Sequence, residues 1–216
     1  MKINEIFYSI SGESIAAGYP TIFIRTFGCP LRCSWCDSLY AVEGKDFQDM
    51  SVDDILSDIS QYNCKRVILT GGEPVIQKDF NELLQALFER DYHVEIETSG
   101  AVDLCAIHVG KEDEDRCTVT MDWKCPSSGM TSRMIEDNLQ KLTSNDVLKC
   151  VVGSLEDLDE MKRISALTSA HVFVSPVFGM IEPKDIVQYL LDNDLTDVRF
   201  QLQIHKFVWS ADKRGV

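Results

Sequence analysis

The chain is organised around one stretch, Gly28-Cys29-Pro30-Leu31-Arg32-Cys33-Ser34-Trp35-Cys36-Asp37. Its cysteines have the spacing C-x3-C-x2-C, which lets three thiolates reach one metal centre from a single loop. Four cysteine ligands close a 4Fe-4S cluster, whereas three leave one iron open. An open coordination position separates a reactive metal site from a structural one. The stretch therefore predicts a reactive iron-sulfur centre held by Cys29, Cys33 and Cys36.

Two other uses of cysteine have to be weighed against this interpretation. A structural zinc site needs a fourth ligand, which a second zinc knuckle would have to supply. A zinc or iron-sulfur module that serves in binding or electron transfer remains an alternative. Disulfides are not expected because no signal segment opens the chain, which also predicts a cytoplasmic protein. The cysteines outside the stretch stand singly, at Cys64, Cys105, Cys117, Cys125 and Cys150.

Composition narrows the class of protein and its partners. A length of 216 residues with 44% hydrophobic residues fits one domain spanning 1–216. No apolar run approaches the roughly 18 residues of a membrane span, so we expect no membrane partner. The formal net charge of −14 predicts a surface that repels a nucleic-acid backbone. We therefore expect a small-molecule substrate and no direct contact with nucleic acid.

Short apolar segments and amphipathic segments alternate along the chain, which predicts an α/β protein built from parallel βαβ units. Residues 1–20 read as loop-rich. A complete eight-stranded barrel needs about 250 residues, so six or seven strands indicate an incomplete TIM-like barrel. The expected strands are 21–27, 67–70, 93–98, 117–121, 147–152, 172–177 and 198–204. The expected helices are 52–59, 80–88, 132–142, 155–167 and 183–191.

The candidate motifs follow these predicted strands. Cys29 follows the first strand, Gly71 the second, Thr98 the third and Lys124 the fourth, and His205 follows the last. Ligands of such barrels sit at the carboxyl ends of the strands. The sequence therefore predicts one site shared by all these segments.

The motifs also resemble a known superfamily. A C-x3-C-x2-C loop after a short strand, with Gly71-Gly72-Glu73-Pro74 at a later strand end, is similar to the radical S-adenosylmethionine (SAM) superfamily. The resemblance narrows to the 7-carboxy-7-deazaguanine synthase family and extends from near residue 5 to the last residue. The segments that carry it are Glu5-Ile6-Phe7-Tyr8-Ser9-Ile10-Ser11-Gly12-Glu13, Cys36-Asp37-Ser38, Glu97-Thr98-Ser99-Gly100 and Lys213-Arg214-Gly215-Val216.

The resemblance implies a radical SAM core with a 4Fe-4S cluster, SAM and Mg2+, the last at Ser38. The family often has Ser-Pro-Lys at 122–124, so only Lys124 matches it firmly. The residues that the resemblance assigns to cofactor binding are Trp35, Cys36, Asp37, Gly71, Gly72, Glu73, Gly100, Asp122, Trp123, Lys124, Ser175, Pro176, Val177 and Phe178.

The resemblance also implies a pterin-binding set. The spacing of the sequence alone predicts that Arg25 lies at the surface. The resemblance instead implies that Arg25 binds the substrate carboxylate, because a guanidinium pairs with a carboxylate through two parallel hydrogen bonds. Position 11 is more often Gln in the family. The residues assigned to the substrate are Ile10, Ser11, Gly12, Glu13, Arg25, Thr98, His205 and Val216.

The implied reaction is the radical ring contraction of 6-carboxy-5,6,7,8-tetrahydropterin to 7-carboxy-7-deazaguanine with loss of ammonia, in queuosine or deazapurine biosynthesis. The cofactor supplies the radical, so no side chain is expected to be the catalyst. The family further implies a homodimer and an electron donor such as flavodoxin or ferredoxin. A radical SAM enzyme that activates a glycyl radical protein is the alternative within enzymes.

Overall fold

The computed structural model describes residues 1–210 and 213–216, and its nine strands form one sheet in the order β3-β1-β2-β4-β5-β6-β7-β8-β9. The strands are β1 (Lys2–Ile10), β2 (Pro20–Thr26), β3 (Gln48–Asp49), β4 (Arg66–Gly71), β5 (His93–Thr98), β6 (Cys117–Trp123), β7 (Val147–Val152), β8 (His171–Pro176) and β9 (Val198–Phe200). The α-helices are α1 (Val52–Ile59), α2 (Phe80–Phe88), α3 (Leu155–Ser165), α4 (Pro183–Asp192) and α5 (His205–Val208).

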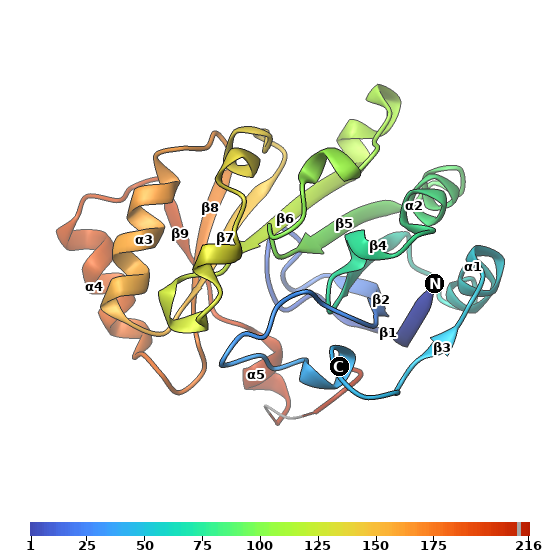
Figure 1. Cartoon of the computed structure of the whole chain (residues 1–216), viewed down its shortest axis with the longest axis horizontal. Coiled ribbons are helices and arrows are strands. Elements are labelled where there is room, and N and C mark those ends of the chain that lie inside the picture. The colour runs from blue at the N-terminus through green and yellow to red at the C-terminus, as the bar shows by residue number, and fades with distance from the viewer. Residues whose placement is uncertain (211–212) are drawn as a thin grey trace.

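From β2 to β9 every neighbouring pair of strands is parallel, while β1 pairs antiparallel with both β2 and β3. The helices α1 and α2 lie at one end of the sheet, and α3 and α4 lie at the other (Figure 1). This mostly parallel, incompletely closed arrangement confirms the α/β class and the partial barrel. No helix within residues 1–210 and 213–216 is long and apolar enough to cross a membrane.

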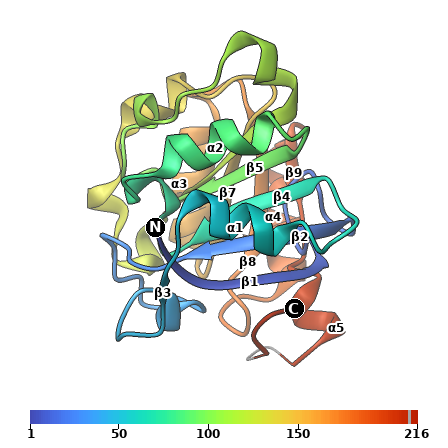
Figure 2. The same cartoon turned by 90° about the vertical axis from the view of Figure 1, so that its right-hand side faces the viewer.

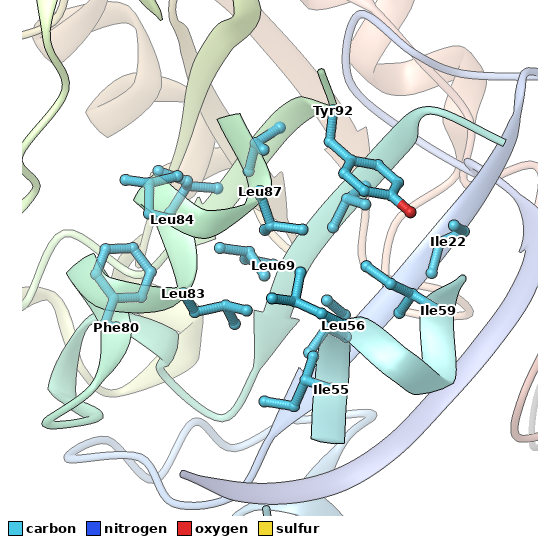
Figure 3. Packing of buried hydrophobic residues seen from close by; sticks show 14 of the residues in the cluster. Ile22, Ile55, Leu56, Ile59, Leu69, Phe80, Leu83, Leu84, Leu87 and Tyr92 are labelled. Carbon is cyan, nitrogen blue, oxygen red and sulfur yellow. The ribbon is translucent and has the colours of Figure 1, made fainter. Parts of the chain in front are cut away.

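The first half of the sheet is held by α1 and α2, which lie side by side over β2, β4 and β5 (Figure 2). Helix α1 begins at a capping box in which Ser51 and Asp54 exchange side-chain and backbone hydrogen bonds. Apolar residues of α1 and α2 meet those of the strands in one cluster, which includes Ile22, Ile55, Ile59, Leu69 and Leu83 (Figure 3). Burying each of these side chains contributes about 1.5 to 3 kcal/mol relative to leaving it exposed.

The second half of the sheet packs on α3 and α4 through a separate cluster, which includes Leu148, Val174, Leu158, Met161 and Ile186. On the opposite face, the strand residues that line the cavity are mostly polar, among them Arg25, Thr70, Glu97, Thr120, Asp122 and Lys149. The apolar residues therefore face the helices, and the polar ones face the concave side where a ligand site can form.

Two sequence predictions for the N-terminal part were wrong. Residues 2–10 form the strand β1 instead of a loop, and β3 is a further short strand, so the sheet has more strands than expected. Strand β1 mixes charged and apolar residues, because Glu5 points to Arg25 on β2 while Ile3 and Phe7 are buried. That mixture hides the alternation on which strand prediction depends.

The helix predicted for residues 132–142 is also absent, and short 3-10 turns at Thr131–Arg133 and Glu136–Gln140 take its place. The cause is Asn138, which is fully buried. Its side chain accepts a hydrogen bond from the backbone of Leu104 at 3.1 Å and donates to the carbonyls of Gly100 and Val102 at 3.1 and 2.8 Å. A short polar side chain that bonds to distant backbone favours turns over a regular helix. The last predicted strand is shorter too, ending at Phe200, and α5 begins at His205.

Candidate active site

One cavity of about 240 Å3 brings together residues from the β1–β2 loop, the cysteine loop, the ends of β4 to β7 and the C-terminal tail. Arg214 of that tail pairs with Asp46 at 2.9 Å, and the C-terminus lies beside the segment that follows the cysteine loop (Figure 1). The sequence-predicted residues that line the cavity are Ile10, Ser11, Gly12, Glu13, Arg25, Cys29, Cys33, Trp35, Cys36, Asp37, Ser38, Gly71, Gly72, Thr98, Asp122, Lys124, Val177, His205 and Val216.

The cysteine loop forms one wall of this cavity and is anchored by its backbone. Gly28 donates to the carbonyl of Ala41 at 2.8 Å, and Ser34 donates to the carbonyl of Ser128 at 3.0 Å. The indole of Trp35 donates to Ser127 Oγ at 3.2 Å. The loop therefore rests on the turn Pro126–Ser128 that follows β6.

The three thiols suit an iron-sulfur cluster in their chemistry. Burial raises the pKa of Cys29 and raises that of Cys33 to about 11, while the ammonium of Lys124 opposes both shifts. A bound metal replaces the thiol protons, and the Lys124 ammonium favours the thiolate form of Cys29 and Cys33 that binds iron. No three His, Cys, Asp or Glu side chains among the described residues are close enough to hold a single metal ion. A cluster differs from a single ion because each thiolate binds its own iron.

The Gly71-to-Pro74 segment packs tightly against the cysteine loop. Gly71 has a φ of +134°, and a Cβ there would lie 2.2 Å from the carbonyl oxygen of Thr26. Glu73 is fully buried and turns away from the cavity, since it accepts from Ser99 N at 2.8 Å, Ser99 Oγ at 2.6 Å and Thr98 Oγ1 at 2.9 Å. Its carboxylate thus fastens the end of β4 to the end of β5.

The remaining predicted cofactor residues do not line the cavity. Gly100 approaches Met121 so closely that a Cβ would lie 2.9 Å from the sulfur, and Trp123 donates to Glu160 at 3.1 Å from within the second core cluster. Pro176 ends β8, and Phe178 is 54% exposed. Ser175 is buried, and its Oγ has no hydrogen-bond partner among the described residues.

The wall that faces the cysteine loop carries Arg25, which is largely buried instead of lying at the surface. Its Nε donates to Glu5 Oε1 at 2.7 Å, and Tyr40 OH donates to the same oxygen at 3.1 Å. The rings of Phe7 and Tyr40 lie 5.8 and 5.9 Å from the guanidinium carbon. Burial would lower the pKa of Arg25, but Tyr40 and Glu5 raise it, so the guanidinium stays charged.

His205 and the tail close the cavity from the side of α5. A Cβ at Gly12 would lie 2.1 Å from His205 Nδ1, so glycine permits the imidazole to pack on the β1–β2 loop. Burial lowers the pKa of His205, although Glu13 opposes the shift. Lys206 pairs with Asp37 at 3.0 Å and ties α5 to the cysteine loop.

Two residues that line the cavity, Glu97 and Lys149, were not predicted as site residues, and neither was Glu5, which contacts Arg25 from outside the lining. Glu97 accepts from Thr70 Oγ1 at 2.6 Å, Lys149 pairs with Glu13 at 3.0 Å, and Glu5 orients Arg25. A signal was present for Lys149, which is the one charged residue of the otherwise apolar strand β7, whereas Glu97 lies in β5 together with the polar residues His93 and Glu95. Buried charges require partners, and such residues are candidates for a site.

Comparisons with known proteins agree with this geometry. Residues 23–113 match the model of the Radical SAM superfamily. A crystal structure of QueE from Escherichia coli has a TM-score of 0.76, with 23% identity over 94% of both chains, which is a likeness of fold. A structure of Streptococcus suis SuiB bound to S-adenosylmethionine has a TM-score of 0.55, with 16% identity over 82% of this chain and 48% of that one. A partial barrel with three cysteines at its ligand end is thus the radical SAM fold.

Curated relatives show which family within this superfamily the chain belongs to. A 7-carboxy-7-deazaguanine synthase from Clostridium acetobutylicum is 41% identical, over 100% of this chain and 99% of that protein. One from Methanospirillum hungatei is 39% identical, over 96% and 85%. The chain belongs to the 7-carboxy-7-deazaguanine synthase family of radical SAM enzymes.

Proposed function

We propose that the chain converts 6-carboxy-5,6,7,8-tetrahydropterin to 7-carboxy-7-deazaguanine with loss of ammonia, as a step of queuosine or deazapurine biosynthesis. This proposal rests on two groups of side chains that line the same cavity. Three thiols stand on one wall, and the partly buried Arg25 and Glu13 stand on the other. The name of a full-length relative, 7-carboxy-7-deazaguanine synthase, supports the same product.

Cys29, Cys33 and Cys36 would hold the 4Fe-4S cluster, with SAM bound at the open iron. The remaining cavity residues near this wall, including Gly71, Gly72 and Lys124, would hold SAM. When bound, these groups would supply the radical chemistry that acts at C6 of the substrate. The chain itself orients C6 and excludes water.

Arg25 would bind the substrate carboxylate. Glu5 occupies its Nε, which leaves the two terminal nitrogens for a carboxylate in the bidentate geometry that guanidinium prefers. The aromatic rings on either side restrict the guanidinium to that orientation. The specificity for a carboxylated pterin would therefore reside in the Glu5–Arg25 pair.

Glu13 would accept hydrogen bonds from the amino and ring N–H groups of the pterin. Its Oε1 is buried and has no hydrogen-bond partner among the described residues. This oxygen can therefore accept hydrogen bonds from a ligand. The lowered pKa of His205 favours the neutral imidazole at pH 7, which can donate to the substrate from one nitrogen and accept at the other. Thr98 and the carboxylate of Val216 complete this set.

Three further parts of the proposal concern partners and metal. Ser38 lines the cavity and would contribute one oxygen to Mg2+, with the substrate and water supplying the rest. A flavodoxin or ferredoxin would deliver the electron, and the enzyme would act as a homodimer. The net charge of −14 supports a small-molecule substrate over direct nucleic-acid binding.

The test is a product analysis. The chain is reconstituted anaerobically with iron and sulfide and incubated with dithionite, SAM, Mg2+ and 6-carboxytetrahydropterin, and the products are followed by mass spectrometry. We expect 7-carboxy-7-deazaguanine together with 5′-deoxyadenosine. Formation of 5′-deoxyadenosine alone would mean that the substrate is wrong and would favour a glycyl-radical-activating enzyme.

A further inference from the structure

Four side chains of alternating charge form a line along the cavity wall. Lys149 Nζ lies 3.0 Å from Glu13 Oε2 and 3.6 Å from Asp122 Oδ2, and Lys124 Nζ lies 3.0 Å from Asp122 Oδ1. Glu13 belongs to the β1–β2 loop, Lys149 to β7, and the other two to the end of β6. All four line the cavity, so the line runs from the proposed substrate side to the proposed cofactor side.

Lys149 is the central member and the most buried, with its side chain only 7% exposed. Asp122 is its direct neighbour in the register of the parallel pair β6–β7, so both side chains project to the same face. Burial would lower the pKa of Lys149, but Glu13 and Asp122 raise it well above its ordinary value. The ammonium therefore stays charged and bound to both carboxylates.

The geometry also decides which oxygen of Glu13 is offered to a ligand. Lys149 occupies Oε2, whereas Oε1 is buried and has no partner among the described residues. Without Lys149 the carboxylate would be free to rotate about its terminal torsion, which has a broad preference. The ammonium therefore fixes the direction of the acceptor.

The far end of the line reaches the cysteine wall. Lys124 lies 5.3 Å from the ring of Trp35, which belongs to the cysteine loop. Asp122, held between Lys149 and Lys124, thus connects the glutamate of the substrate side to the loop that would carry the cluster. No residue of this line belongs to a flexible surface, since all four side chains are at most 18% exposed.

We propose that Lys149 is a positioning residue that sets Glu13 and Asp122 relative to each other, and so aligns the pterin with the radical-generating side of the cavity. The inference rests on the proposed function. Lys149 itself needs no contact with the reacting atoms. Its removal acts through the two carboxylates, which would repel each other across the space that the ammonium had filled.

The experiment compares Lys149→Gln and Lys149→Met with the wild type, with Lys162→Met as the matched control. Lys162 lies on the exposed face of α3 and bonds to Asn193, far from the cavity. Pterin binding is measured by anaerobic calorimetry on the reconstituted protein, and the ratio of 5′-deoxyadenosine to product is measured in turnover. Iron content and thermal unfolding report whether each variant is folded and loaded.

We expect both Lys149 variants to load iron as the wild type does, while pterin affinity falls about tenfold or more and SAM cleavage without product rises. The control should change neither quantity. Unchanged pterin affinity and unchanged product ratio in a folded Lys149→Gln would overturn the inference. If Lys149→Met does not fold, Lys149→Gln decides, since it stays polar but removes the charge that holds Glu13 and Asp122 together. A wild type that binds no pterin would instead overturn the proposed function.

Discussion

Glu95 on β5 is a buried carboxyl group close to the floor of the cavity, and it carries a prediction about pH. It accepts from Thr120 Oγ1 at 2.7 Å, and Thr120 Oγ1 lies 2.8 Å from Ser14 Oγ in the β1–β2 loop. Burial and the nearby Glu97 raise the pKa of Glu95 from its ordinary 4.5 to about 7. The folded chain therefore holds a proton that the unfolded chain releases between these values.

The sign of the stability change follows from this proton. The stabilisation is fully present below pH 4.5 and is lost as the pH rises through 7, because the ionised carboxylate must then stay buried. Glu95→Gln keeps the acceptor for Thr120 without the charge. It should be more stable than the wild type at pH 8 by about 3 kcal/mol, and the difference should shrink toward zero at pH 4.5.

Urea unfolding of the metal-free proteins between pH 5 and 8 measures this difference. The exposed Glu89→Gln on α2 is the matched control and should show no such trend. A stability difference for Glu95→Gln that does not grow with pH contradicts the assignment of the proton to Glu95.

Ser38 carries a prediction about metal removal. If its hydroxyl is a ligand of Mg2+, then Ser38→Ala should lower turnover at limiting Mg2+ about tenfold or more, while Ser38→Thr, which keeps the hydroxyl, should retain most of it. Excess Mg2+ should partly restore Ser38→Ala. Turnover that is unaffected by stripping Mg2+ from the wild type argues against the metal at this site.

Site residues that belong to short local motifs could be predicted from the sequence, whereas residues that act on partners distant in the chain could not. The cysteines and Gly71-Gly72 stand in short motifs whose spacing carries the chemistry. Glu5 and Lys149 belong to no such motif. Their partners, Arg25 and Glu13, are 20 and 136 positions away in the chain. Which side of a strand Arg25 occupies likewise follows from the pairing of β1 with β2, which the sequence pattern did not predict.

Among the elements, the N-terminus of α3 supports the cysteine loop from outside the cavity. The turn that holds Trp35 is itself held by Asp157, which accepts from Ser127 N at 2.7 Å, from Ser127 Oγ and from Gly153 N at 2.6 Å. Asp157 is fully buried. It therefore couples a helix end to the loop that would bind the cluster.

Asp157→Ala should leave these three donors without their acceptor, so we expect a loss of about 2 to 4 kcal/mol in the free energy of unfolding. Iron retention after reconstitution should fall with it. The control is Asp185→Ala, an exposed acidic residue in the first turn of α4, which should cost less than about 1 kcal/mol. If the two substitutions had equal effects, Asp157 would stabilise the fold only through its interaction with the helix dipole, and not through the three hydrogen bonds.

The alternation of elements was predictable wherever apolar periodicity was strong. Strands β4, β5, β7 and β8 and helices α1, α2 and α3 agree with the prediction to within a few residues. Strand β1 and residues 132–142 differ because polar contacts from elsewhere in the fold decide their conformation. Those contacts are formed by Glu5 and by Asn138, and no local pattern reports them.

For the whole molecule, the division of the core explains where the site lies. Two apolar clusters hold α1 with α2 and α3 with α4 on the helix side of the sheet. The concave side is left to charged residues from β2, β5, β6 and β7, which would be costly to bury without a function or a partner. The incomplete closure of the barrel leaves room for the cysteine loop and the C-terminal tail to meet at this side.

The most direct test of the whole account uses 6-carboxytetrahydropterin carrying deuterium at C6. We predict that 5′-deoxyadenosine gains one deuterium and that 7-carboxy-7-deazaguanine forms alongside it, because the proposed binding mode would hold C6 next to the radical-generating side. Mass spectrometry of both products reads the outcome. Unlabelled 5′-deoxyadenosine, formed without the deazaguanine, would contradict the central claim that this cavity aligns a carboxylated pterin for hydrogen abstraction.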